Sequence, residues 1–410
     1  MAGVRGVRVL VLDGNENQAV ACVRSLSRAG HKVEVGSSSG WSKAGWSRHS
    51  SAAFRYPSPG ENAVAFVDAV MARAASTPGT LVMPLTERST LPLSAMRNRA
   101  EAAGALLVLP DHATVLRAFD KAETTRIARA AGVETPRTTL LESLADLDAL
   151  LQSARYPLVV KPAASAVLQE GAGVRSTGGP HYASTPEELR AAFDAVRAKT
   201  SRMIAQEFVP GRGAGYFALM VHGEPRAEFA HRRIRDVRPS GSGSSVREAV
   251  APDPVVRDAA LRVLRELGWH GVAMVEFRVR PDGVPVFLEV NGRFWNSLAL
   301  AVNAGVDFPA MVAQLAERGD VPRSEGYRIG TRCRWLLGDA RHLVAVMMGR
   351  PRGFTGEFPG RLRTVRDFVT PVRGTFHDNF TLDDPLPELG DWLDFLVHKI
   401  PASLSARGKA

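Results

Sequence analysis

The pattern of apolar and polar positions in the first part of the chain predicts a parallel α/β domain. An apolar run over residues 7–13 fits a buried parallel strand. The amphipathic stretch 18–29 fits a helix that ends at Gly30, before a second strand over 31–35. The alternation continues as helix, strand, helix and strand over 62–75, 80–84, 91–103 and 106–109. We therefore expect a Rossmann-like domain, although the G-x-G-x-x-G turn of dinucleotide-binding proteins is missing.

The pattern then predicts antiparallel strands between helices. Residues 111–132 read as helical, and 156–162 as a strand that contains Lys161. The Gly/Ser/Ala-rich stretch 163–180 is expected to be a mobile loop whose N–H groups turn toward phosphate. A helix over 185–199, capped by Ser184 or Thr185, precedes a strand over 203–211. The remaining elements are strands over 216–221 and 228–231, a loop over 241–245, a helix over 254–267, a strand-like stretch over 328–336 and an amphipathic helix over 391–399.

Two β-runs within residues 271–293 form the most informative stretch. Asp282-Gly283 between them is a strong signal for a two-residue hairpin turn. Counting outward from such a turn places Glu276 directly opposite Glu289, where like charges repel. Two carboxylates in this position on otherwise apolar strands need a cation between them.

The same face of the hairpin offers further polar groups. Side-chain alternation places Asn291 and Arg293 on the face of Glu289. The two glutamates and Asn291 supply hard oxygen ligands, which suit Mg²⁺ shared with substrate phosphates. The planar guanidinium of Arg293 could grip a phosphate or a carboxylate. The alternative interpretation is an ordinary amphipathic hairpin with an exposed acidic face.

Composition narrows the class of protein. With 410 residues, 45% of them hydrophobic and 23% charged, the chain is expected to be a globular enzyme of several subdomains. The sequence lacks a signal-peptide pattern and any apolar run of ~18 residues, so we expect a cytoplasmic protein without a membrane partner. Cys22 and Cys333 are expected to be buried thiols. The net charge of +10 permits nucleic-acid binding, but no nucleic-acid module is recognisable, and anionic small molecules explain the arginines equally well.

The order of motifs along the chain resembles the ATP-grasp superfamily of carboxylate–amine ligases. Phe119-Asp120-Lys121 opens a helix, Val159-Val160-Lys161-Pro162 ends a strand, and Gln206-Glu207-Phe208-Val209-Pro210-Gly211 forms a hinge before the hairpin. Stretches 229–235, 289–297 and 383–387 are similar to bacterial ATP-grasp proteins described as carbamoyl-phosphate-synthase-like or as carboligases. The resemblance covers residues 7–321. It implies the ATP-grasp fold, an α/β class with α+β lobes that hold ATP, behind a Rossmann-like N-terminal domain.

The resemblance also implies roles for single residues. Lys121 and Lys161 would contact the phosphates of ATP. Adenine would lie against the hinge, made of Gln206, Glu207, Phe208 and Val209. Residues 212–215 lack the carboxylate with which many relatives hold the ribose.

The metal ligands implied are again Glu276, Glu289 and Asn291. Arg293 would stabilise an acyl phosphate. Arg233 or Arg235 would hold the γ-phosphate or an acidic substrate, with a solvated basic strand as the alternative. Trp295 and Asn296 would line the acceptor pocket, with core packing as the alternative for Trp295.

Four regions follow: an N-terminal α/β domain (1–115), an ATP-grasp N-terminal lobe (116–225), a C-terminal lobe with the metal site (226–325) and an extension (326–410). The implied enzyme uses ATP with Mg²⁺ or Mn²⁺ to convert a carboxylate into an acyl phosphate. It then joins the acyl group to an amine and releases ADP and phosphate. Alternatives are a ligase that uses a thiol or bicarbonate, and a non-catalytic nucleotide-binding module. The partners would be small carboxylates and amines, whose identity the sequence does not specify. A homodimer is possible.

Overall fold

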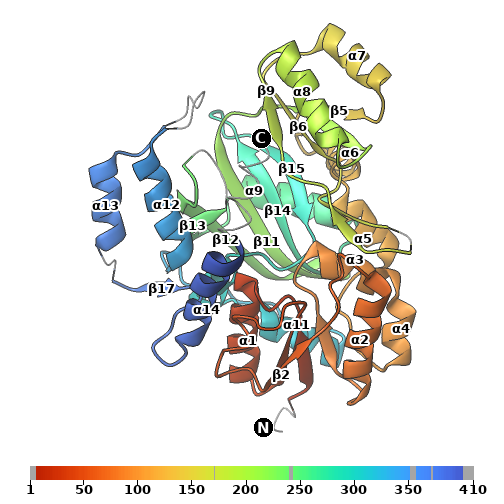
Figure 1. Cartoon of the computed structure of the whole chain (residues 1–410), viewed down its shortest axis with the longest axis vertical. Coiled ribbons are helices and arrows are strands. Elements are labelled where there is room, and N and C mark those ends of the chain that lie inside the picture. The colour runs from red at the N-terminus through yellow and green to blue at the C-terminus, as the bar shows by residue number, and fades with distance from the viewer. Residues whose placement is uncertain (1–5, 170, 240–242, 351–356, 371–372, 400–410) are drawn as a thin grey trace.

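The first part of the computed structural model is a parallel sheet between helices (Figure 1). Residues 6–169, 171–239, 243–350, 357–370 and 373–399 are described. The sheet order is β3-β2-β1-β4, with β1 (Arg8–Val11), β2 (Lys32–Ser37), β3 (Ala52–Arg55) and β4 (Leu81–Met83). It is covered by α1 (Asn17–Arg28), α2 (Ala63–Ala75), α3 (Glu87–Ala95) and α4 (Arg97–Ala102). Val9 and Val11 pack in the cluster that contains α1, whereas Leu10 packs with α2, as period-2 alternation requires.

Two predicted elements of this domain differ from the structure. The helix expected over 91–103 is two helices, because Met96 (φ −110°, ψ 35°) leaves the helical region between α3 and α4. Helix α3 also begins earlier than expected, at Glu87, because Thr86 and Ser89 form a capping box. The strand expected over 106–109 contributes only an isolated bridge from Leu106 to Leu81.

Residues 138–207 form a separate small lobe, at the top of Figure 1. Its antiparallel sheet has the order β5-β10-β6-β9, with β5 (Thr138–Leu141), β10 (Met203–Glu207), β6 (Leu158–Pro162) and β9 (His181–Ala183). Helices α7 (Leu144–Ser153) and α8 (Pro186–Arg197) share one core with this sheet, and Thr185 caps α8 as expected.

The stretch expected to be a loop over 163–180 contains a β-ribbon instead. Its strands are β7 (Ala166–Leu168) and β8 (Val174–Ser176), and they pair antiparallel. The ribbon reaches the N-terminal domain, where the Val174 N–H donates to the Pro59 carbonyl at 2.7 Å. Residue 170, within this stretch, lies outside the described residues.

A seven-stranded sheet occupies the centre of the molecule. Its order is β15-β14-β11-β12-β13-β16-β17, and every pair is antiparallel except β16–β17. The strands are β11 (Arg212–Val221), β12 (Glu224–Asp236), β13 (Ser244–Val250), β14 (Gly271–Val279), β15 (Pro285–Asn291), β16 (Arg332–Arg334) and β17 (Thr375–His377). One face packs on α5 (His112–Phe119), α6 (Lys121–Ala130) and α9 (Pro254–Glu266). The other packs on α1, α10 (Leu298–Ala304) and α11 (Phe308–Arg318). Residues 241–242 of the expected loop over 241–245 lie outside the described residues.

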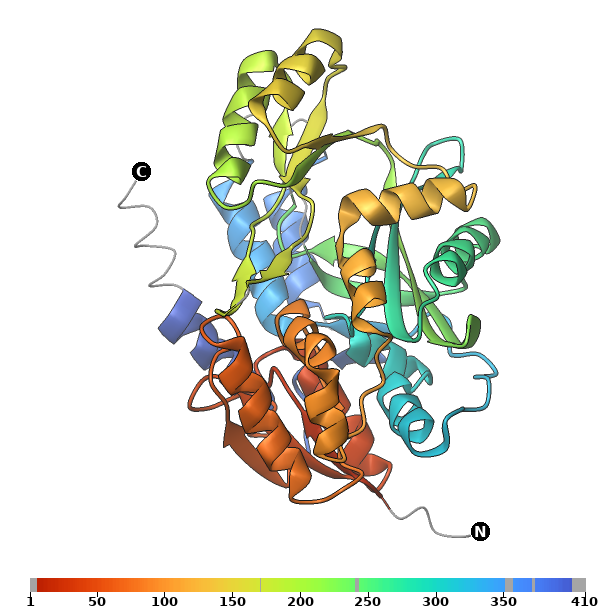
Figure 2. The same ribbon diagram turned by 90° about the vertical axis from the view of Figure 1, so that its right-hand side faces the viewer.

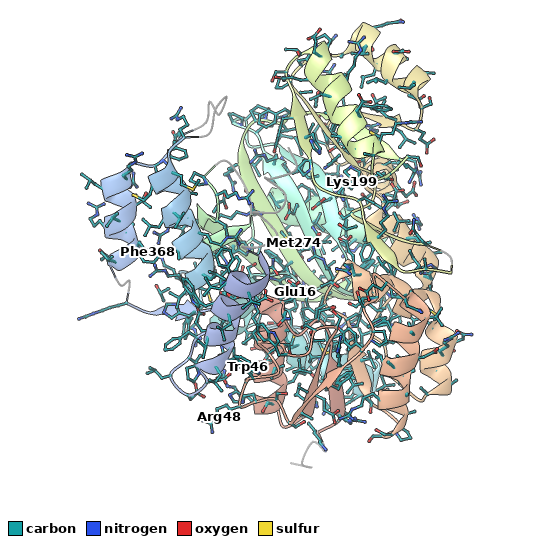
Figure 3. The ribbon with its side chains drawn as sticks, viewed as in Figure 1. Glu16, Trp46, Arg48, Lys199, Met274 and Phe368 are labelled. Atoms are coloured by element: carbon teal, nitrogen blue, oxygen red, sulfur yellow. The ribbon has the colours of Figure 1, made fainter. Side chains whose placement is uncertain are left out.

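The last described part of the chain binds the N-terminal domain. It contains α12 (Leu336–Met348), α13 (Arg361–Val369), α14 (Leu386–Asp394) and a π-helix, η1 (Phe395–Lys399). The helix expected over 391–399 thus begins earlier and changes type at Phe395. Buried ion pairs join Arg24 to Asp384 and Lys43 to Asp391, both at 2.8 Å. Figure 3 shows Trp46 and Arg48 beside α14, and the Arg48 N–H donates to Asp384.

The sheets place the lobes differently from the expected boundaries. A boundary at residue 225 would separate β11 from β12, which a tight turn with positive φ at His222 and Gly223 joins into one hairpin. The small lobe ends at Glu207, and the expected extension 326–410 contributes β16 and β17 to the central sheet. Figure 2 shows the small lobe above this sheet and the N-terminal domain below it.

Two further expectations concern membranes and cysteines. Across the described ranges, no single helix has the length and apolar character needed to cross a membrane. Helices α10 and α11 meet those criteria only as a pair bent by 86°. Cys22 and Cys333 are free and buried, as expected.

Candidate active site

Glu276 on β14 and Glu289 on β15 lie directly opposite each other, as predicted, but the hairpin reaches this register by another route. The two-residue turn is wrong: the Arg280 N–H donates to the Val284 carbonyl at 3.0 Å, so the loop has three residues and Gly283 takes a φ of +85°. A β-bulge then leaves Leu288 unpaired, which shifts the register back. The two one-residue deviations cancel.

The two carboxylates differ in their electrostatic surroundings. Burial and the charge of Glu289 raise the pKa of Glu276. Burial also acts to raise the pKa of Glu289, but Lys121 and Lys161 reverse this effect and lower it. The Lys121 ammonium is 3.6 Å from Glu289, and the Arg233 guanidinium is 3.6 Å from Glu276. A cation between the carboxylates would remove the repulsion that opposes ionisation of both.

Asn291, the last residue of β15, and Arg293, two residues further on, extend the cluster. The Asn291 amide donates to Glu289 at 3.1 Å, and its oxygen accepts from Arg293 at 3.1 Å. Arg293 also donates to the Phe294 carbonyl at 3.0 Å. These bonds hold the amide and the guanidinium beside the carboxylate pair.

Two lysines approach the same place from different elements. Lys121 is the first residue of α6, and its ammonium donates to the Ser165 hydroxyl at 2.8 Å. Lys161 lies on β6 with Val159, on the face that lines the cavity. Burial lowers the pKa of Lys161, and Glu289 partly offsets this effect. Within the described residues no carboxylate lies at ion-pair distance from Lys161, so its charge suits an anionic ligand.

The hinge offers backbone and aromatic groups. The N–H groups of Glu207 and Phe208 donate to carbonyls of neighbouring segments, each at 3.0 Å. Among the described residues the Val209 N–H has no backbone acceptor, so it can donate to a ligand. The Phe208 ring is 37% exposed and packs edge-on against Tyr182, and the Gln206 amide donates to the Thr138 hydroxyl at 3.0 Å.

A cavity of about 610 Å³ lies between the small lobe and the central sheet. Its lining brings together most of the predicted residues: Lys121, Lys161, Gln206, Glu207, Phe208, Val209, Arg233, Glu276 and Glu289. Asn291 and Arg293 are not in the lining: Asn291 donates to Glu289, and Arg293 donates to Asn291. Arg235 is not brought to the cavity, because Asp339 holds its guanidinium at 3.2 Å.

Trp295 and Asn296, the two residues predicted to line the acceptor pocket, have different surroundings. Trp295 is buried in the core, with its ring centroid 4.5 Å from that of Phe217, whereas Asn296 is exposed. Trp295 is therefore a core residue, which was the alternative interpretation of its sequence position.

Several residues of this region were not predicted from the sequence, among them Tyr182 and Arg278 in the cavity lining. Glu87 lies 3.9 Å from Arg293 and carries a carboxylate from the N-terminal domain to the cluster. Its position soon after β4 was a usable signal, because ligand sites gather at the carboxyl ends of parallel strands. Leu288 lines the cavity because of the β-bulge. The sequence contains no signal that predicts this bulge.

The donor set fits a divalent cation and a polyphosphate. Two opposed carboxylates and an amide oxygen are hard ligands of the kind that Mg²⁺ prefers. The repulsion that raises the pKa of Glu276 is the feature that a bound cation would relieve. Lys161 and Arg233 line the cavity beside this pair and suit phosphate oxygens.

The sequence is similar to those of several curated bacterial ligases. No family model matches the chain. The D-alanine–D-alanine ligase of Cupriavidus taiwanensis is 30% identical over 191 residues, which cover 42% of this chain and 54% of that protein. The D-alanine–D-alanine ligase B of Chromobacterium violaceum is 30% identical over 190 residues, covering 42% and 57%. The chain thus spans about half the length of the curated relatives it matches.

Solved structures place the fold. The biotin carboxylase–βγ-ATP complex of Campylobacter jejuni has a TM-score of 0.62 at 16% identity, covering 79% of this chain and 74% of that one. The L-amino acid ligase of Bacillus licheniformis has a TM-score of 0.57 at 21% identity, covering 77% and 75%. The two lobes around a carboxylate pair are an ATP-grasp fold. The chain thus shares its fold with these solved structures and is similar in sequence, over less than half of its length, to D-alanine–D-alanine ligases.

Proposed function

We propose that the protein is an ATP-dependent ligase that joins a carboxylate to an amine and forms an amide or peptide bond. The observation that carries the proposal is the opposed pair Glu276 and Glu289, facing Lys161 across a cavity between two lobes. The similarity to D-alanine–D-alanine ligases supports an amine as the acceptor, in preference to bicarbonate or a thiol.

Each group in the cavity has a distinct role in this proposal. Lys121 and Lys161 bind the phosphates of ATP, and the hinge holds the adenine through the Val209 N–H. Glu276, Glu289 and Asn291 would hold Mg²⁺ or Mn²⁺, which neutralises phosphate charge when bound.

The arginines then act on the reacting groups. Arg233 faces the γ-phosphate, and Arg293 orients the carboxylate that is to be activated. Arg235 lies outside the cavity lining, and we assign it a structural role between β12 and Asp339.

The chemistry needs no nucleophile from the protein. A substrate carboxylate oxygen attacks the γ-phosphorus, and the bond to ADP breaks. The amine nitrogen then attacks the acyl carbon, phosphate leaves and a proton is released. The protein positions these groups and stabilises the developing negative charge with fixed cations.

The test is Mg²⁺-dependent release of ADP from ATP, measured with pooled carboxylates, each with and without amines. Release that requires both substrates would establish the ligase. Glu289→Ala should abolish nearly all release while the protein stays folded by circular dichroism, because it removes a metal ligand. A folded Glu289→Ala protein with normal turnover would contradict the assignment.

The same assay separates the alternatives. Release that requires a carboxylate and a thiol, or bicarbonate, would move the protein to another ligase class. ATP binding without release in any pool would favour a non-catalytic nucleotide-binding module. Absence of ATP binding would overturn the proposal.

A further inference from the structure

Helix α13 exposes an apolar stripe that the fold does not use. Of its residues, only Thr364 is buried, whereas Leu362 is 88% exposed, Val365 41% and Val369 66%. Because successive residues of an α-helix are rotated by about 100°, the three apolar side chains fall within about 60° of one another. A short helix is normally stabilised by burying its apolar face. Packing within this chain therefore does not account for the stripe.

A different side of α13 is held by the rest of the molecule. The Arg334 guanidinium lies 4.6 Å from the centroid of the Phe368 ring and donates to the Phe368 carbonyl at 2.9 Å. The Asp367 carbonyl accepts from Arg235 on β12 at 3.4 Å. These contacts fix the rotation of the helix about its axis, so the stripe stays on the surface.

Arginines border the stripe. On the same helical projection, Arg361 and Arg366 lie on its two sides, each about 40° from the nearest apolar residue. Arg363 follows on the side of Arg366, and all three arginines are exposed. Asp367 is the one acidic residue of α13. The helix is thus amphipathic and basic on the side that faces solvent.

Helix α12, which packs beside α13 in Figure 1, exposes apolar side chains in the same way. Val344, Met347 and Met348 are exposed, whereas His342 and Val346 are buried. The three exposed side chains fall within about 100° of one another. Exposed apolar stripes on two adjacent helices mark an interaction surface.

The charge and the shape of α13 identify the partner. A second copy of the chain would bring the arginines of two such helices together, and like charges repel. A protein partner is held by side chains that fill pockets, and a helix exposed on most of its circumference forms none by itself. A basic amphipathic helix instead suits the interface of a bilayer, with its apolar side chains among the acyl chains and its arginines at anionic headgroups. We propose that α13, together with the exposed face of α12, docks on the surface of an anionic lipid bilayer.

The proposal concerns helices that lie on a membrane and do not cross it. It is compatible with the finding that no single helix in the described ranges could span a membrane. It revises the sequence-based expectation of no membrane partner, which considered spanning segments and signal peptides. It does not depend on the proposed ligase activity.

The test is co-sedimentation of the full-length protein with vesicles of phosphatidylcholine, either alone or with about one third phosphatidylglycerol. Wild-type protein should bind the anionic vesicles and not the neutral ones. Binding should weaken when NaCl is raised from about 0.1 M to about 0.5 M, because salt screens the charges. Arg366→Gln should lower the partition constant about fivefold, and Leu362→Gln about tenfold.

Two variants on other helices are the matched controls. Arg126→Gln removes an exposed arginine from α6, and Val255→Gln removes from α9 an apolar side chain that is 59% exposed, similar to Val369. Both should bind the anionic vesicles as wild type does.

A second measurement locates the contact. Because Cys22 and Cys333 are buried, a polarity-sensitive thiol dye should react selectively with the cysteine of a Leu362→Cys variant. Its emission should move to shorter wavelength when anionic vesicles are added. The dye on a Val255→Cys variant should not respond.

Several results would overturn the proposal. One is the absence of binding to anionic vesicles. Another is binding that neither Leu362→Gln nor Arg366→Gln weakens, or a dye on Leu362→Cys that does not respond, because a different basic surface of this chain of net charge +10 would then be responsible. A dimer in sedimentation velocity that Leu362→Gln dissociates would assign the face to a second copy. Binding to polyglutamate and not to vesicles would assign it to an acidic protein.

Discussion

At the scale of single residues, the cavity is lined by charged side chains whose burial and mutual repulsion destabilise the folded protein. Glu276 and Glu289 face each other on neighbouring strands, where like charges destabilise a sheet. Lys161 is an ammonium on a strand whose neighbours are apolar, and burial lowers its pKa. Such local conflicts are expected where a site is arranged for a ligand. The stability lost at the cavity should therefore be recoverable by substitution.

Glu276→Gln tests this statement directly. Removing one charge relieves the repulsion that raises the pKa of Glu276, so the Tm measured in EDTA should rise by about 1 °C, the effect of about 1 kcal/mol on a chain of 410 residues. The rise in Tm that Mg²⁺ with ADP gives to wild-type protein should disappear. Glu266→Gln, at an exposed position at the end of α9 and outside the cavity lining, is the matched control and should keep the response. A lower Tm in EDTA would show that the pair is already compensated without a metal.

Some of the site residues could be read from the sequence, and the reason is local. Glu276, Glu289 and Lys161 are lone charges in apolar strands, and alternation alone gives their faces. The place of Glu87 soon after a parallel strand was a usable signal, but its contact with Arg293 could not be predicted, because the two residues are distant in sequence and only the folded chain brings them together. Arg235 has the same sequence context as Arg233, but its partner Asp339 lies on a helix that the sequence did not indicate.

At the scale of elements, the hairpin β14–β15 shows why register is harder to predict than strand identity. Both strands were predicted, yet the turn has one residue more than expected and Leu288 bulges out. A change of one residue moves every later side chain to the other face. The predicted pairing of Glu276 with Glu289 holds only because the bulge compensates the turn. A bulge depends on tertiary packing, so periodicity could not reveal it.

Helix α14 shows a second element whose pattern misleads, because its polar side is the buried one. Glu388 and Asp391 are buried, whereas Leu386, Leu389 and Leu393 are exposed. Burial raises the pKa of Glu388 to about 7. Its Oε1 accepts from the Trp392 indole at 2.8 Å, and its Oε2 has no partner in the part of the chain that the structure describes.

This pKa predicts a pH-dependent effect of Glu388→Gln. In the unfolded chain the carboxyl loses its proton near its usual pKa of about 4.3, and in the folded chain near 7. Between these values the folded state binds the proton more tightly, so raising the pH lowers the free energy of unfolding. The substituted amide cannot ionise, and its oxygen can still accept from Trp392. Urea unfolding should show Glu388→Gln to be more stable than wild type at pH 8, by about 4 kcal/mol at most, and equal at pH 4. A pH-independent difference would contradict the assignment.

At the scale of the whole molecule, a buried polar network fastens the last elements to the first domain. Arg24 on α1 pairs with Asp384 at 2.8 Å, and its other nitrogens donate to carbonyls of residues 378, 379 and 384. Lys43 pairs with one carboxylate oxygen of Asp391, and the other oxygen accepts a hydrogen bond from the Trp335 indole. This network joins the N-terminal domain to the segment that follows β17, the last strand of the central sheet.

Breaking the network at Arg24 should be costly. Arg24→Ala leaves Asp384 buried without its cation, and the free energy of unfolding should fall by about 3–5 kcal/mol in urea titrations. Asp384→Ala should cost a similar amount, and the double variant less than the sum. Arg363→Ala, which removes an exposed partner of Asp367 on α13, should stay within about 0.5 kcal/mol. A loss below about 1 kcal/mol for Arg24→Ala would show that water replaces the pair.

The network also sets the order in which the protein can be completed as it is made. Arg24 and Asp384 are separated by 360 positions, and Lys43 and Asp391 by 348. At about 5–20 residues per second, a ribosome needs roughly 20–70 s to travel from the first partner to the second. Until the end of that interval, Arg24 and Lys43 have no ion-pair partners, because Asp384 and Asp391 have not yet been synthesised. Its final packing is therefore a late event, and a polypeptide interrupted before residue 384 carries that defect permanently.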